Sequence, residues 1–200
     1  FLHKTFDNCV RATFNKITVD GDMSTNDTVI LLANGAAENT KISANSKRSK
    51  QFSVTLMNIM KKMAQSVVLD GEGATKFVTV NVRNASSEQD AEKCARAIAN
   101  SLLCKTAWFG GDPNWGRVVA AAGYSGAKFN PSKTSLHYNG IPVIVKGMDA
   151  GTPEEKLAKT VAQKLAHLLT AQATENPLGR GSQEYFFTGP TLGLARIGIK

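Results

Sequence analysis

One acidic side chain stands where the backbone is least hindered. Glu72 lies between Gly71 and Gly73 in the stretch DGEGATK at residues 70–76. Such a carboxylate is compatible with a plain turn, a phosphate loop, a metal loop or a clamp for a cationic substrate. The dinucleotide-binding fingerprint requires a strand, a glycine turn and then a helix. Here a helical pattern comes first and a strand pattern follows, and no GxxxxGK[ST] loop is present, so both kinds of phosphate loop are excluded.

A turn after a helix is the simplest interpretation of this stretch, because glycine is common at helix C-termini. A carboxylate near a helix C-terminus is nevertheless unfavourable by roughly 0.3–1 kcal/mol. A residue that breaks a local rule is a modest pointer to function. Glu72 is therefore a candidate binding residue, although the residue types alone do not define its chemistry.

Metal sites are not expected. The acidic stretch that begins at Asp20 resembles a calcium loop over three residues only. Its sixth position is Thr25, where the loop needs glycine, and its twelfth is Leu31, where a bidentate glutamate is needed. The histidines are isolated from one another and from the cysteines, so zinc has no ligand set.

The cysteines and the charge point to an ordinary globular protein. Cys9, Cys94 and Cys104 are expected to be buried free thiols in a reducing compartment. The net charge of +8 would suit a nucleic-acid-binding protein, but the basic residues are spread along the chain apart from residues 47–50. No RNA-binding signature is present, so no nucleic-acid partner is expected.

The sequence contains no run of 18 apolar residues and no signal-peptide pattern at its N-terminus, so neither a membrane partner nor secretion is expected. We expect a cytoplasmic protein. The chain begins with Phe1 rather than methionine, which favours a processed or truncated product.

Apolar periodicity defines the elements that must position these residues. Helices are expected at residues 2–17, 52–69 and 86–103, at a start capped by Asp112 with Pro113, and at 152–169. Strands are expected at residues 29–34 and 77–83, with a loop at 36–51 and a hairpin at 135–147 that turns at Asn139-Gly140. This order predicts an α+β protein, with helices packed on a mixed or antiparallel sheet in one domain over residues 1–200.

Three long stretches resemble one family. They are ATFNKITVDGDMSTNDTVILLANG at residues 12–35, DGEGATKFVTVNV at 70–82 and KTAWFGGDPNWGR at 105–117. In this order they are similar to the β chain of ornithine acetyltransferase, the bifunctional glutamate N-acetyltransferase of arginine biosynthesis. The resemblance covers about residues 1–150, and it is specific because the motifs are long.

The resemblance implies a precursor that cuts itself into α and β chains, which assemble as a hetero-oligomer with the fold of a two-chain α/β sandwich. A threonine at the start of the β chain is the nucleophile, and its own amine can act as the base. It carries acetyl from N-acetylornithine to glutamate by ping-pong transfer, without a cofactor, although some members also accept acetyl-CoA. The family's nucleophile would lie upstream of Phe1. No catalytic residue is therefore assigned in this chain, and Thr5 and Thr13 are not candidates.

Glu72 matches the family's substrate-binding glutamate, which implies that its carboxylate pairs with an amine of ornithine. Residues 172–200 depart from the family pattern as a divergent C-terminal tail, where the closest alignment puts Gly198 near an expected asparagine. Two alternatives therefore stay open: a related acyltransferase of secondary metabolism, and a non-catalytic partner subunit.

Overall fold

The computed structural model describes residues 1–162, 165–172 and 183–188. The chain forms two compact units, one made of Phe1–Ile17 with Asp22–Val67 and the other of Thr18–Gly21 with the chain from Val68 onward. The expectation of one domain stays a prediction, and most of the divergent tail lies outside the described residues.

The first unit contains α1 (Leu2–Ala12), the 3-10 turn η1 (Phe14–Lys16) and most of α2 (Lys47–Leu69). The rings of Phe1 and Phe52 meet edge to face with their centroids 5.8 Å apart. The predicted helix over residues 2–17 is too long. Helix α1 ends at Ala12, and its C-cap residue Thr13 donates its hydroxyl to Cys9 O at 2.6 Å, a back-bond that competes with the regular helix.

The predicted strand at residues 29–34 is wrong. This segment has no regular secondary structure and forms no ladder with any strand in the described part of the chain, and Ile30 and Leu32 are 69% and 88% exposed. The loop predicted at residues 36–51 is shorter than expected, because α2 begins at Lys47. The hydroxyl of Ser46 accepts from Ser49 N at 3.0 Å and so supports a helical start that the polar sequence concealed.

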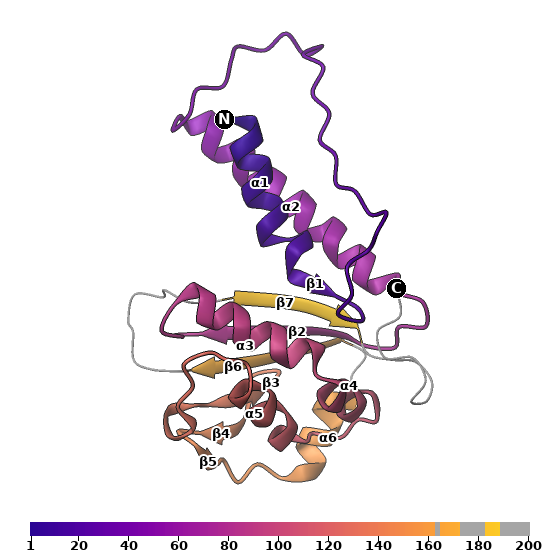
Figure 1. Ribbon diagram of the computed structural model, residues 1–200, viewed down its shortest axis with the longest axis vertical. Coiled ribbons are helices and arrows are strands. Elements are labelled where there is room, and N and C mark those ends of the chain that lie inside the picture. Colours follow the sequence, from indigo (N-terminus) through magenta and orange to yellow (C-terminus); the bar gives the residue numbers. More distant parts are fainter. Residues whose placement is uncertain (163–164, 173–182, 189–200) are drawn as a thin grey trace. The chain divides into compact units, whose positions relative to one another are not determined.

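The second unit is built on a mixed sheet with the strand order β1-β7-β2-β6-β3-β4-β5 (Figure 1). β2 pairs in parallel with β6 and antiparallel with β7. The strands are β1 (Ile17–Thr18), β2 (Phe77–Arg83), β3 (Leu136–Tyr138), β4 (Ile141–Val145), β5 (Met148–Asp149), β6 (Leu165–Gln172) and β7 (Gln183–Thr188). The prediction of a mixed sheet in an α+β fold is confirmed.

The centre of this sheet is β2. Its alternating valines predicted a strand with one buried face, but Phe77 and Thr79 on the other face are also buried. Strands pair on both of its edges, which is the environment of a central strand. Helix α6 spans Glu154–Ala162 and residues 165–172 form β6, so the helix predicted to run to residue 169 is wrong from residue 165 onward.

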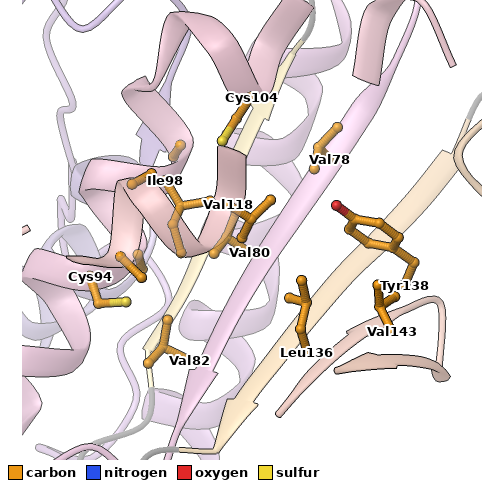
Figure 2. Close-up of a cluster of buried hydrophobic side chains, with 14 of the residues drawn as sticks. Val78, Val80, Val82, Cys94, Ile98, Cys104, Val118, Leu136, Tyr138 and Val143 are labelled. Carbon is orange, nitrogen blue, oxygen red and sulfur yellow. The ribbon is translucent and has the colours of Figure 1, made fainter. Parts of the chain in front are cut away.

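Helices α3 (Glu88–Asn100), α4 (Leu102–Phe109) and α5 (Trp115–Gly123) pack together over the sheet, and α3 contacts both β2 and β7. Figure 2 shows side chains from these helices facing side chains of β2, β3 and β4 across one apolar core: Val78, Val80, Val82, Cys94, Ile98, Cys104, Val118, Leu136, Tyr138 and Val143. This core joins the helices to the sheet within the second unit.

Short-range caps explain where the helices start. Ser87 caps α3, and its hydroxyl accepts from Asp90 N. The helix predicted to run to residue 103 breaks at Ser101, whose hydroxyl caps α4 by accepting from Cys104 N. The cap predicted at Asp112 is also wrong, because Asn114 Oδ1 accepts from Arg117 N and α5 starts at Trp115.

Two consecutive tight turns build the β3–β4–β5 edge of the sheet. The predicted hairpin turn is confirmed, since Asn139 and Gly140 have φ values of +48° and +81°, as a type I′ turn requires. A second turn of the same kind, which the sequence did not reveal, joins β4 to β5 at Lys146 and Gly147 with φ values of +50° and +78°.

All three cysteines are free and buried, as predicted. Burial raises the pKa of Cys94 and of Cys104 to about 11. We expect a thiol-specific colour reagent to label these two cysteines only after unfolding, because the reactive thiolate is both inaccessible and unpopulated. Fast labelling of either cysteine in the native protein would contradict this packing.

Candidate functional site

The turn that carries Glu72 directly follows α2. Gly71 N donates to Val68 O at 3.3 Å, and Ala74 N donates to Gly71 O at 2.9 Å, which closes a four-residue turn. Gly73 adopts a φ of +71° at the third position of this turn, a conformation that favours glycine there. Glu72 occupies the second position and is exposed. The glycine therefore has a geometric role, which is to present the neighbouring carboxylate at the tip of a tight turn.

The Glu72 carboxylate is available to a ligand. Within the described part of the chain, no hydrogen bond or ion pair is recorded for its side chain. An exposed carboxylate on a short, closed turn can accept charge-assisted hydrogen bonds from an ammonium or guanidinium group. The site thus offers one anionic contact for a cationic group.

Lys76, at the end of the same motif, has a different environment. It is 8% exposed, and its ammonium donates to Trp108 O in α4 and to Val161 O in α6 at 2.9 Å. Burial lowers the pKa of Lys76. No local pattern in the sequence distinguishes this lysine, because both acceptors are distant in the chain.

The motif at residues 12–35 contributes the short stretch Thr18–Gly21 to this unit. Thr18 Oγ1 donates to Asn100 Oδ1 at 2.7 Å, and a side chain added at Gly21 would lie 3.7 Å from the same amide group. Lys105 of α4 is 1% exposed, and its ammonium donates to Val19 O. The stretch is therefore held against the junction of α3 and α4.

Burial lowers the pKa of Lys105 to about 8, and the nearby Asp20 carboxylate opposes this shift. In the unfolded chain the pKa is about 10.5. Between these values the unfolded state binds more protons than the folded state, so the free energy of unfolding rises with pH by up to roughly 3 kcal/mol from this group. We expect this rise to disappear in Lys105→Met.

The measurement is urea unfolding of the wild type and Lys105→Met between about pH 8 and pH 10. Cysteine ionisation lowers stability over part of this range, but it does so in both proteins, so the difference between the two curves isolates Lys105. Parallel curves would show that the amine is not desolvated in the folded protein.

The third motif forms a compact turn between α4 and α5. Asp112 N donates to Ala107 O at 2.8 Å, and Asn114 Nδ2 donates to Asp112 Oδ2 at 3.2 Å. The Arg117 guanidinium donates to Leu103 O at 2.9 Å. These side chains satisfy the ends of neighbouring helices, and the contacts assign the motif a structural role.

Other candidate chemistry is not found in the described residues. No group of three or more His, Cys, Asp or Glu side chains there could hold a metal ion. In the same residues, no helix has the length and apolar character needed to cross a membrane. Thr5 and Thr13 are both buried within the first unit.

Comparison with known proteins identifies the family of this chain. A sequence model of the ArgJ family matches residues 1–187. The chain belongs to the ArgJ family. The resemblance to the bifunctional glutamate N-acetyltransferases of arginine biosynthesis is thereby confirmed.

Individual members of the ArgJ family are similar over most of this chain. The arginine biosynthesis bifunctional protein ArgJ of Geobacter sulfurreducens is 45% identical over 170 residues, which is 85% of this chain and 43% of that protein. A glutamate N-acetyltransferase of Methanocaldococcus jannaschii is 48% identical over 160 residues, which is 76% of this chain and 39% of that protein. This chain therefore spans less than half the length of these two relatives.

A solved structure supports the fold of this ArgJ-family chain. The crystal structure of the arginine biosynthesis bifunctional protein argJ from Bacillus halodurans superposes with a TM-score of 0.85 at 32% sequence identity. The match covers 95% of this chain and 88% of the solved chain. The mixed sheet with its covering helices is thus an architecture found in this family.

Proposed function

We propose that this chain is the β-chain part of a glutamate N-acetyltransferase that moves acetyl from N-acetylornithine to glutamate. The observation that carries the proposal is the exposed Glu72 carboxylate, presented on a closed glycine turn in a chain of the ArgJ family. A relative at 48% identity bears the name of this activity. The relatives' names do not favour the two alternatives, a secondary-metabolism acyltransferase and a non-catalytic subunit.

The reaction proceeds in two acyl transfers. A threonine hydroxyl outside this chain attacks the acetyl carbonyl of N-acetylornithine, the amide C–N bond breaks, and ornithine leaves with the proton from the hydroxyl. The amine of glutamate then attacks the acetyl ester, the C–O bond breaks, and the threonine regains a proton. Glu72 pairs with an ammonium group of the ornithine substrate. This pairing orients the substrate so that its acetyl carbonyl faces the nucleophile.

Two features support a second polypeptide as partner, which we take to be the α chain of the same precursor. This chain covers 88% of the solved ArgJ chain but only 43% and 49% of two curated ArgJ relatives, as expected for a protein that is made long and works as two chains. The first unit also exposes apolar side chains in its extended segment and at helical spacing along α2, namely Ile30, Leu32, Ile59 and Met63. Exposed apolar surface of this kind favours a protein interface.

The test is the intact mass of every chain in natively purified protein, before and after incubation with N-acetyl-L-ornithine. We expect a β chain that begins with threonine, contains these residues and gains one acetyl group, which is lost again when glutamate is added, together with an α chain that stays unmodified. Acetyl-CoA in place of N-acetylornithine tests it as an alternative donor. A single chain that never carries acetyl would overturn the proposal.

A further inference from the structure

Two motif loops and one helix meet through buried lysines. Lys105 projects from α4 to Val19 O, and Lys76 reaches from the Glu72 loop to Trp108 O near the end of the same helix. Both lysines are buried, and each joins segments of the second unit that are far apart in sequence. Helix α4 is therefore the structural element that both loops share.

We infer that Lys76 and Lys105 are positioning residues, which fix the Glu72 turn and the Thr18–Gly21 stretch to helix α4 as a common support. For Lys76 the inference rests on the proposed function, because its consequence for activity is the placement of the Glu72 carboxylate. Neither lysine contacts substrate in this account, and each acts through the loop that it holds.

The Glu72 turn has an anchor on each side. Before it, Val68 at the end of α2 is fully buried and accepts from Gly71 N through its carbonyl. After it, Lys76 is buried and bonded to two helices. Only a short segment lies between these two anchors, and it contains the closed turn with Glu72 at its tip. The position of the carboxylate thus depends directly on the second anchor.

The choice of lysine follows from what surrounds its ammonium group. Trp108 O and Val161 O belong to the last turns of α4 and α6, where the carbonyl groups carry partial negative charge. A cation placed between two helix C-termini is stabilised by both. Trp108 O also accepts from Gly111 N at 3.1 Å. The same carbonyl therefore links the Glu72 loop to the turn between α4 and α5.

A double-mutant cycle in the complete two-chain protein tests the action of Lys76 through Glu72. We expect Lys76→Met to raise the KM for N-acetylornithine roughly tenfold, a modest effect for a displaced binding group, with kcat nearly unchanged. In a Glu72→Gln background the same substitution should change KM by less than about twofold, because the positioned group is already gone. Lys76→Arg, which keeps a cationic donor, should restore part of the affinity.

The matched control is Lys159→Met, which removes an exposed lysine from the last turn of α6 without touching either loop. Normal KM in Lys76→Met, or fully additive effects in the cycle, would overturn the role assigned to Lys76. A merely structural role would lower the melting temperature and leave the KM of the folded protein unchanged.

Hydrogen exchange read by mass spectrometry tests the inference without any assay of activity. Lys76→Met should increase exchange in residues 70–76, and Lys105→Met should do so in residues 18–21, while exchange in β2 and in the control variant stays as in the wild type. If both loops exchange as in the wild type, the inference is wrong even if the enzyme is active. If the protein transfers no acetyl but the loops respond as expected, the proposed function fails and the positioning role stands.

Discussion

Glu72→Gln should raise the KM for N-acetylornithine by roughly 10–100-fold and leave the melting temperature unchanged. A hydrogen bond to a charged group contributes roughly 1.5–3 kcal/mol, and each 1.4 kcal/mol corresponds to a factor of ten in affinity. Glutamine keeps the length of the side chain but removes its charge and replaces one acceptor oxygen with an NH2 donor. Because Glu72 is exposed and has no recorded partner within the described residues, folding does not depend on that charge.

The matched control for this prediction is Asp70→Asn. Asp70 is an exposed acid two residues away, so its removal changes the local field by the same charge without removing the contact at the tip of the turn. Steady-state kinetics with N-acetylornithine and glutamate as variable substrates would separate the two half-reactions. Equal losses in both variants would mean that a diffuse negative potential, rather than a pairing at Glu72, attracts the substrate.

Gly147→Ala should lower the free energy of unfolding by roughly 2–5 kcal/mol, the sum of strain at positive φ and a steric clash. Gly147 has a φ of +78°, and an added Cβ would lie 2.6 Å from Pro131 O and 2.8 Å from Ser132 Cα. Both neighbours are backbone atoms, so no side-chain rotation relieves the contact. The backbone is also pinned at this point, since Gly147 N donates to Thr134 O at 2.8 Å.

Gly140→Ala separates these two contributions. Gly140 has nearly the same φ of +81° in the preceding turn, but an added Cβ would meet no atom within 4 Å. We expect a loss of about 1–2 kcal/mol from the backbone conformation alone. Denaturant unfolding of the two variants, side by side, gives the clash as the difference. Equal losses in the free energy of unfolding would show that the loop before β3 moves away from the new methyl group with little loss of stability.

The parts of the fold that could be predicted rest on signals a few residues long. Ser87 caps α3 through a partner three residues away, and Asn139-Gly140 has the backbone preferences that its turn needs. The alternating valines of residues 77–83 indicated the strand correctly. Two candidate helix caps, Asp112 and Asn114, lie two residues apart before α5. The predicted cap at Asp112 was wrong, because Asn114 caps the helix.

The errors arose where distant contacts decide the outcome. Residues 29–34 have the composition of a strand, but no partner strand in the described chain pairs with them. Residues 165–172 continue a helical pattern and yet form β6, because β2 and β3 lie beside them and supply the ladder. Strand formation depends on such neighbours more strongly than on intrinsic preference.

The same division applies to the candidate site. The tight turn and its acid follow from local residue types, because Gly73 favours the positive φ at the third position of the turn and Glu72 then occupies its second position. Only the tertiary structure revealed Lys76 and Lys105 as anchors, because a lysine in a sequence is by default a solvated charge. Their acceptors lie 32, 85 and 86 residues away, and the burial that makes these bonds strong exists only once helices and sheet have packed.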